Sequence, residues 1–216
     1  MAEIEVGRNI LEANQSMADK FRQRFAAQGL KVLNLISSPG AGKTSVLERT
    51  LTRLEGRLRC AVIEGDIQTD EDARRVAACG VPAVQIQTQG ACHLDGPMIA
   101  EALEDLDLSQ LDLLIIENVG NLVCPVDFDL GEDMKVAVLS VTEGDDKPAK
   151  YPALFRAAGV LLVNKIDLLP YIDCDLGRIH DTCRALNPKQ KVFDISCRTG
   201  EGLQDWVGWL ESWVKG

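Results

Sequence analysis

A short apolar segment that runs directly into a glycine-rich turn constrains this chain more than any other feature. Residues 32–36 have the composition of a buried strand, and the sequence Ser37-Ser38-Pro39-Gly40-Ala41-Gly42-Lys43-Thr44 follows them. A helix is predicted over residues 43–54. A strand, a glycine-rich turn and a helix that begins with Lys-Thr are the parts of a loop that binds phosphate groups through backbone N–H groups.

Each residue type in this loop has a physical role. Gly40 and Gly42 let the backbone approach the phosphates, Lys43 is expected to bridge the β- and γ-phosphates, and Thr44 is expected to ligate Mg²⁺. Ser37 stands where such loops usually have their first glycine, although serine is small enough to turn there. The rest of the expected phosphate site consists of Ser38, Pro39, Ala41 and Ser45. A glycine-rich turn with a coincidental lysine is the alternative, and the flanking strand and helix weigh against it.

Apolar strands and helices alternate along the rest of the chain. The predicted strands cover residues 60–64, 83–87, 113–117, 136–141, 160–164 and 192–195. The predicted helices cover residues 6–28, 70–79, 97–106, 152–158, 175–186 and 203–214. Nearly continuous apolar strands between helices predict an α/β protein, with a mostly parallel sheet covered by helices on both faces. This is the three-layer fold of P-loop NTPases, here with an additional N-terminal helix.

A second motif, Asn164-Lys165-Ile166-Asp167, ends one of the predicted strands. Asp167 can accept hydrogen bonds from the ring N–H and the exocyclic amine of guanine, a pair of donors that adenine lacks. Lys165 is expected to lie along the base, and Asn164 to tie this loop to the phosphate loop. Ser196, Cys197 and Arg198 follow the last strand and are expected to supply a second contact to the base. The motif therefore favours GTP over ATP.

Two acidic residues stand at strand ends that should face the nucleotide. Asp66 follows one strand and Glu117 ends another, so both are candidates for Mg²⁺ contacts. With Lys43 they form the candidate catalytic set, and Asp66 is the candidate for positioning the attacking water. Gly120 is expected to offer its N–H to the γ-phosphate, so that loss of this phosphate releases the loop. The alternative for each acid is a solvated or helix-capping side chain.

The charge and length of the chain narrow its possible partners and its location. A formal net charge of −10 argues against nucleic acid and against an anionic membrane surface. No apolar run approaches the roughly 20 residues that span a bilayer, and the N-terminus does not resemble a signal peptide. A cytoplasmic protein with mostly reduced cysteines is therefore expected. We expect residues 1–29 to form a helical appendage and residues 30–216 to form one P-loop GTPase domain.

Cys92 and His93 are adjacent in a predicted loop, and Cys124 lies four residues beyond Gly120. Thiolate and imidazole groups suit Zn²⁺ or Ni²⁺, and three ligands leave a coordination position open. From the residues alone, two buried thiols and a hydrogen-bonded histidine are the favoured alternative. If Cys124 does bind metal, nucleotide state and metal affinity must be coupled reciprocally, because the same loop serves both.

Taken together, the chain resembles the HypB family, GTPases that deliver nickel during maturation of [NiFe]-hydrogenase. The resemblance rests on residues 37–44, 64–70, 90–95, 117–125 and 142–152. It implies Ni²⁺ or Zn²⁺ binding by Cys92, His93 and Cys124 at a dimer interface. It also implies slow, Mg²⁺-dependent hydrolysis of GTP to GDP, GTP-dependent homodimerisation through residues 168–172, and a Lys150 that reaches the partner's nucleotide. Other hydrogenase-maturation or nickel-handling proteins are the implied partners.

One departure from the family and three alternatives remain at this point. Some members carry an N-terminal nickel-binding stretch, whereas residues 1–59 contain no Cys and no His, so tight nickel storage is expected to be absent. A urease-type nickel GTPase should have proline between its Cys and His, which Cys92-His93 lacks. A small-molecule kinase is disfavoured by Asp167 and by the lack of an evident lid. A nucleotide-gated module that hydrolyses slowly overlaps with the main hypothesis.

Overall fold

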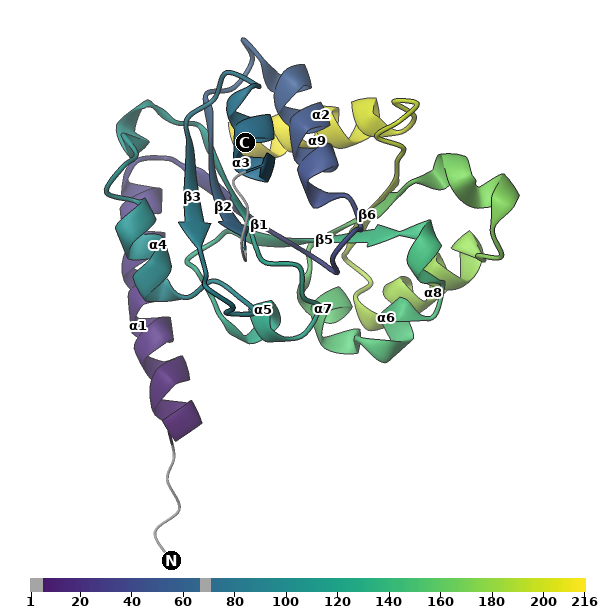
Figure 1. Cartoon of the computed structure of the whole chain (residues 1–216), viewed down its shortest axis with the longest axis horizontal. Coiled ribbons are helices and arrows are strands. Elements are labelled where there is room, and N and C mark those ends of the chain that lie inside the picture. The colour runs from purple at the N-terminus through teal and green to yellow at the C-terminus, as the bar shows by residue number, and fades with distance from the viewer. Residues whose placement is uncertain (1–5, 67–70) are drawn as a thin grey trace, which may run out of the picture.

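The computed structural model describes residues 6–66 and 71–216, and in this part of the chain seven strands form one sheet (Figure 1). The strand order is β3-β2-β4-β1-β5-β6-β7, and every neighbouring pair is parallel. Helices cover both faces of the sheet (Figure 1). The predicted three-layer α/β fold with an N-terminal helix is therefore confirmed, and the sheet is parallel throughout.

The element bounds follow the predicted alternation closely. The strands are β1 (Lys31–Ser37), β2 (Cys60–Asp66), β3 (Ala83–Gln87), β4 (Leu113–Glu117), β5 (Met134–Ser140), β6 (Val160–Asn164) and β7 (Lys191–Asp194). The α-helices are α1 (Val6–Ala27), α2 (Lys43–Leu54), α3 (Glu71–Ala77), α4 (Gly96–Ala102), α5 (Cys124–Asp127), α6 (Lys147–Lys150), α7 (Pro152–Ala157), α8 (Leu176–Leu186) and α9 (Leu203–Lys215). Short 3-10 helices are η1 (Leu108–Gln110), η2 (Val141–Glu143) and η3 (Ile166–Tyr171).

The structure corrects several predicted boundaries. Helix α4 ends at Ala102 rather than at residue 106, since Glu104 and Asp105 would place negative charge at the negative end of the helix dipole. Strand β5 ends at Ser140 because Ser140 and Glu143 form a capping box that starts η2. The proposed cap of α3, at residue 69 or 70, lies outside the described residues.

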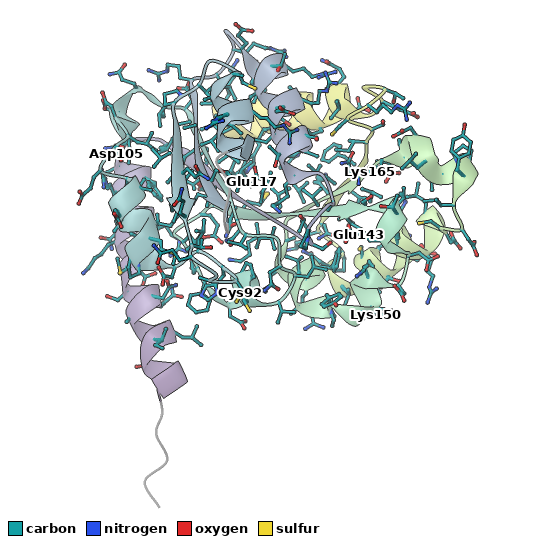
Figure 2. All side chains as sticks on the ribbon, viewed as in Figure 1. Cys92, Asp105, Glu117, Glu143, Lys150 and Lys165 are labelled. Atoms are coloured by element: carbon teal, nitrogen blue, oxygen red, sulfur yellow. The ribbon has the colours of Figure 1, made fainter. Side chains whose placement is uncertain are left out.

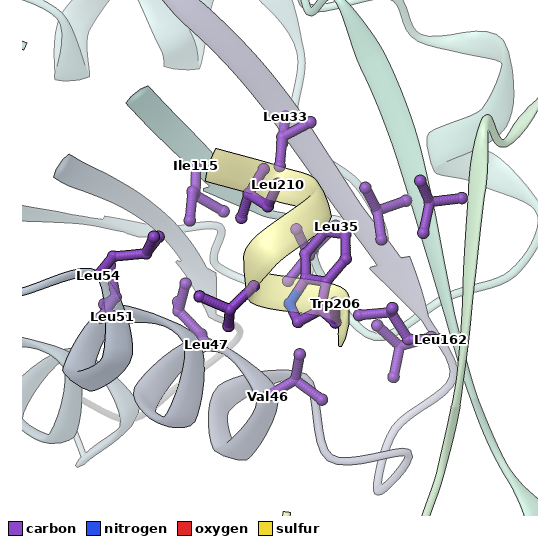
Figure 3. Packing of buried hydrophobic residues seen from close by; sticks show 14 of the residues in the cluster. Leu33, Leu35, Val46, Leu47, Leu51, Leu54, Ile115, Leu162, Trp206 and Leu210 are labelled. Carbon is purple, nitrogen blue, oxygen red and sulfur yellow. The ribbon is translucent and has the colours of Figure 1, made fainter. Parts of the chain in front are cut away.

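One face of the sheet packs against α2 and α9. Successive strand residues point to opposite faces, so Leu33 and Leu35 of β1 both face these helices. They form one buried cluster with Leu47 of α2 and Trp206 of α9 (Figure 3). The Trp206 indole N–H donates to Thr50 Oγ1 at 2.9 Å, so the largest buried side chain of this cluster has its polar atom satisfied.

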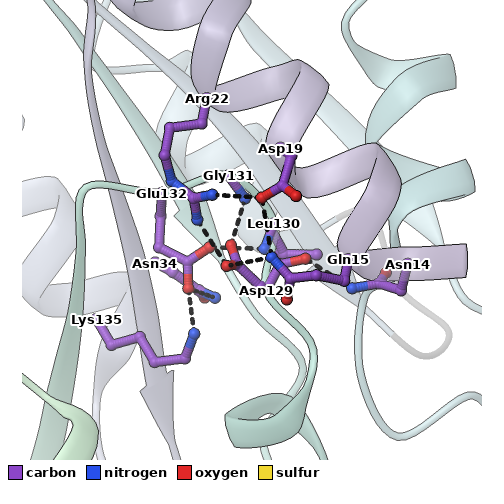
Figure 4. Close-up of polar contacts among 10 residues, drawn as sticks. All are labelled: Asn14, Gln15, Asp19, Arg22, Asn34, Asp129, Leu130, Gly131, Glu132 and Lys135. Atoms are coloured by element: carbon purple, nitrogen blue, oxygen red, sulfur yellow. Dashed lines mark hydrogen bonds and ion pairs between the residues drawn. The ribbon is translucent and has the colours of Figure 1, made fainter. Parts of the chain in front are cut away.

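Helices α1, α4, α7 and α8 cover the opposite face. Phe25 of α1 lies in one buried cluster with Ile63 of β2, so the N-terminal helix shares the core of the sheet. Polar contacts join α1 to the segment before β5, where Arg22 pairs with Asp129 at 2.6 Å (Figure 4). The division at residue 29 stays a prediction. No helix among the described residues is both long and apolar enough to cross a membrane.

Candidate functional site

The candidate site lies at the carboxyl edge of the sheet, where strand order changes direction around β1. Crevices at such points are the usual ligand sites of open α/β sheets. One cavity of about 450 Å³ is lined by the loop after β1 together with Glu64, Glu117 and Gly120. A second cavity of about 450 Å³ shares Gly42 and Lys165 with the first, and it extends to the β6 and β7 loops.

The loop after β1 has the backbone that phosphate binding requires. Gly40 and Gly42 have φ values of +78° and +95°, in the left-handed region that favours glycine. A Cβ atom at Gly42 would stand 2.6 Å from Asn164 Nδ2, whereas one at Gly40 would meet nothing within 4 Å. Lys43 begins α2, so the positive end of a twelve-residue helix faces the first cavity.

The exceptional Ser37 has a clear explanation in the structure. Its φ is not among the positive values of the described residues, so no glycine is required at this position. Its hydroxyl accepts a hydrogen bond from Lys43 Nζ at 3.1 Å and donates to the Ser38 carbonyl at 2.7 Å. Ser37 therefore orients the lysine, a role that glycine cannot fill.

Thr44 and Glu117 meet beside the first cavity. The Thr44 hydroxyl donates to Glu117 Oε1 at 2.9 Å, and both side chains are buried. Two oxygen atoms of the kind that Mg²⁺ prefers therefore lie together at the cavity that Lys43 also lines, and the magnesium site itself stays a prediction. Asp66 ends β2 at the same edge, but its side chain lies outside the described part of the structure.

Asn164 ties three loops together. Its Nδ2 donates to the Ala41 carbonyl at 3.0 Å, and its Oδ1 accepts from the backbone N–H groups of Lys165 at 2.8 Å and Cys197 at 3.4 Å. Lys165 Nζ donates to the Gly40 carbonyl at 2.7 Å. The expected link between the base loop and the phosphate loop is thus present, in two hydrogen bonds.

Asp167 lies in the second cavity with Cys197 and Arg198. Ser196 Oγ donates to Asp167 Oδ1 at 2.6 Å, which fixes the carboxylate. The Ser196 N–H donates to the Glu201 carbonyl at 3.0 Å, and the backbone contact to the base expected from residues 196–198 stays a prediction. The Ser196 hydroxyl is therefore the group that contacts the candidate base-reading carboxylate.

We expect Gly42→Ala to destabilise the fold and weaken nucleotide binding much more than Gly40→Ala. Both substitutions place alanine in left-handed backbone, at about 1–2 kcal/mol each. Only the Gly42 variant also forces Asn164 away, which adds about 1–3 kcal/mol of overpacking and disturbs the joined loops. Thermal unfolding and nucleotide titration of both variants measure the difference; equal losses would contradict the role given to the Asn164 contact.

Cys92 and His93 lie together in the loop after β3, and the fold brings them to Cys124, the first residue of α5. One candidate ligand atom from each lies within 4.8 Å of the others. The His93 ring packs against Phe128, tilted by 34° with the centroids 3.8 Å apart. Burial lowers the pKa of His93, which favours the neutral, metal-binding form. The hydrogen bond with Cys124, together with burial, raises the pKa of the exposed Cys92 thiol. An exposed thiol does not fit the alternative of two buried cysteines.

The remaining cysteines fit the expected packing role. Burial raises the pKa of Cys60 to about 12 and the pKa values of Cys183 and Cys197 to about 11, so these thiols stay protonated. His180 lies on α8 and contacts Asp194 at 2.9 Å. It therefore lies apart from the cysteine–histidine cluster.

Lys150 lies apart from both cavities, on α6, where it pairs with Asp146 at 2.5 Å (Figure 2). The expected dimer segment forms η3, and its Tyr171 is 82% exposed. The structure therefore leaves both residues accessible to another molecule.

Sequence reasoning missed three residues near the cavities. Arg75 of α3 lines both cavities and pairs with Glu48 at 2.7 Å. Glu143 contacts the Ser38 hydroxyl, and burial raises the pKa of this carboxyl. Asn118 lines the first cavity and is fully buried. The Ser-x-x-Glu capping pattern was a usable signal for Glu143, whereas nothing local marks the other two.

The position of the glycine-rich loop next to β1, in a sheet of this order, defines the class of P-loop NTPases. Consistent with this, residues 31–194 match the family model described as "CobW/HypB/UreG, nucleotide-binding domain". The chain belongs to this family and, by its relatives, to the HypB hydrogenase maturation factors. Hydrogenase maturation factor HypB of Escherichia coli (strain K12) is 52% identical over 212 residues, which are 98% of this chain and 72% of that protein.

Solved structures agree. HypB from Helicobacter pylori in complex with nickel has a TM-score of 0.89 and 39% identity, covering 94% of this chain and 95% of that chain. Hydrogenase maturation factor HypB from Archaeoglobus fulgidus has a TM-score of 0.88 and 37% identity, covering 94% of this chain and 99% of that chain. These relatives favour a HypB protein over the urease-type and kinase alternatives.

Proposed function

We propose that this protein is a GTP-hydrolysing metallochaperone that couples its nucleotide state to the binding and delivery of nickel or zinc during [NiFe]-hydrogenase maturation. One observation carries the proposal. The segment that leaves β4 lines the first cavity, here called the phosphate cavity, from Glu117 to Gly120. Four residues later it reaches Cys124, which lies with Cys92 and His93 in the candidate metal cluster. The names of its HypB relatives, one of them crystallised with nickel, support the same function.

The proposed binding and hydrolysis of GTP are assigned to the residues of the two cavities. Lys43, the N-terminus of α2 and the glycine N–H groups bind the phosphates, and Asp167 selects guanine. The neighbouring oxygens of Thr44 and Glu117 suit Mg²⁺, which neutralises charge on the phosphates. Asp66 is the proposed residue that positions the attacking water.

The cluster of Cys92, His93 and Cys124 has ligands suited to a site that binds a metal ion and passes it on. Two thiols and one imidazole within 4.8 Å of one another suit Ni²⁺ or Zn²⁺. Three ligands leave a coordination position for the acceptor or for a second subunit. We propose a GTP-dependent homodimer in which the partner approaches Tyr171 and Lys150, and we propose other maturation proteins as donor and acceptor of the metal.

Titration with Ni²⁺ and Zn²⁺ in the apo, GDP and GTP-analogue states tests this function. We expect the nickel affinity to differ between nucleotide states by about 5- to 150-fold, the usual range of coupling between two sites. Cys92→Ala should lower nickel affinity by at least about 10- to 100-fold, because a ligand itself is lost. Cys174→Ala, a cysteine outside the cluster, is the matched control. Equal affinity in all states, unaffected by Cys92→Ala, would refute the proposed function.

A further inference from the structure

One buried amide connects the two candidate sites. Asn118 follows Glu117 directly, lines the phosphate cavity and is 0% exposed. Its Oδ1 accepts two backbone hydrogen bonds, from Leu94 at 3.1 Å and from Val119 at 3.0 Å. Asn118 Oδ1 therefore faces the backbone N–H groups of two different segments.

The two N–H groups belong to the two loops that the proposed function must couple. Leu94 directly follows the candidate metal ligand His93. Val119 precedes Gly120, which packs so closely on the phosphate loop that a Cβ atom there would stand 3.0 Å from Pro39 Cγ. A displacement of either loop therefore acts on the same side-chain oxygen.

The amide nitrogen of Asn118 is also hydrogen-bonded, on the side of β1. Asn118 Nδ2 donates to Asn34 Oδ1 at 3.2 Å, and Asn34 Nδ2 in turn donates to Glu132 Oε1 at 3.3 Å (Figure 4 shows the second contact). Asn34 is fully buried in β1. Asn118 therefore cannot turn to follow one loop without breaking a bond to the other or to β1, and buried polar groups without partners are unfavourable.

Side-chain packing adds a second connection at the same place. Leu94 is fully buried, and a Cβ atom at Gly65 would stand 2.8 Å from its Cδ2. Gly65 lies in the lining of the first cavity. The loop of Cys92 and His93 therefore packs against the cavity lining through the Leu94 side chain, and it is hydrogen-bonded to Asn118 of the same lining.

We infer that Asn118 is the positioning residue that transmits nucleotide state to the metal site. This inference rests on the proposed function and specifies its route. When the Val119-Gly120 segment changes position with the γ-phosphate, the shared oxygen carries the change to Leu94 and so to His93 and Cys92. Asn118 acts by positioning the loop, since its side-chain hydrogen bonds go to Leu94, Val119 and Asn34 and not to a candidate ligand atom.

The structure supplies a matched control on the same loop. Asn14 of α1 is buried, and its Oδ1 accepts from the Gly96 N–H at 2.8 Å, two residues beyond Leu94. The bond has the same chemistry as that of Asn118, but Asn14 lines neither nucleotide cavity. Removing it loosens the loop and also the contact of Asn14 Nδ2 with the Asp129 carbonyl at 2.7 Å, but it leaves every hydrogen bond of Asn118 in place.

The experiment compares Asn118→Ala and Asn14→Ala in the full chain, titrated with Ni²⁺ in the GDP and GTP-analogue states. Both variants should bind nickel more weakly. In Asn14→Ala the ratio of the two affinities should stay within about twofold of wild type, whereas in Asn118→Ala it should fall to within about twofold of one. By reciprocity, the effect of nickel on GTP-analogue affinity must change by the same factor.

The outcomes separate the inference from the function on which it rests. A wild-type ratio retained in Asn118→Ala, or lost equally in Asn14→Ala, overturns the inference alone. A ratio of one in the wild type overturns the proposed function and the inference together. If Asn118→Ala does not fold, Asn118→Asp carries the test, because it loses the donor to Asn34 that anchors the shared oxygen, so the side chain can follow one loop without moving the other. Its ratio should fall, and an unchanged ratio overturns the inference.

Discussion

Lys43→Ala is expected to weaken GTP binding by about 10- to 100-fold, the value of a charge-assisted hydrogen bond. It should also lower the rate of the bound nucleotide's hydrolysis by about 10²- to 10³-fold, because preorganised charge next to the transferred phosphate is lost. The structure supports a preorganised lysine, since Ser37 Oγ holds Lys43 Nζ at 3.1 Å. Equilibrium titration and single-turnover hydrolysis measure the two effects separately.

Lys189→Ala removes the same charge from an exposed position before β7 and serves as the control. It should leave both affinity and rate unchanged. A Lys43→Ala variant that binds and hydrolyses GTP like the Lys189 control would exclude this cavity as the nucleotide site.

Asp167→Asn is expected to lower the preference for GTP over ATP by about 10²- to 10⁴-fold, because a site built for two hydrogen bonds rejects a base that cannot form them. Ser196 Oγ already donates to Asp167 Oδ1, so an asparagine can keep its oxygen there and present its amide to the base. That amide faces the donors of guanine unfavourably, but it can pair with the C2 carbonyl of xanthine. XTP binding should therefore rise as GTP binding falls.

Competition titrations with GTP, ATP and XTP check this prediction. Asp173→Asn changes the same charge at an exposed position six residues away, and its preference for GTP should match that of the wild type. An unchanged preference in Asp167→Asn would mean that guanine is selected elsewhere.

The sequence predicted best what is encoded locally. Strand positions followed from apolar runs, and the site loops followed from motifs whose residues are close together. Asn164 could be paired with the phosphate loop because both motifs have known places at a sheet edge. By contrast, Cys92 and Cys124 lie too far apart in sequence for a local ligand pattern, and only the fold brings them together.

The residues that could not be predicted act through distant partners. Asn118 bonds residues 24 and 84 positions away, and Arg75 pairs with Glu48, 27 positions away. No periodicity carries information over such separations. Ser37 is the opposite case. The sequence marked it as an irregularity of the loop, but its backbone does not need a glycine and its hydroxyl is hydrogen-bonded to Lys43 Nζ.

The contact between α1 and the segments that carry Cys92, His93 and Cys124 has a practical consequence for anyone who shortens this chain. Asn14 bonds the Gly96 N–H at 2.8 Å and the Asp129 carbonyl at 2.7 Å, and these residues flank the loop of Cys92 and the helix of Cys124 respectively. A fragment that starts at β1 keeps the described residues that line the first cavity, but it loses the Asn14 side chain, which contacts both segments that carry Cys92, His93 and Cys124. Measurements on such a fragment would therefore report on the nucleotide cavity while the cluster of Cys92, His93 and Cys124 is no longer held by Asn14.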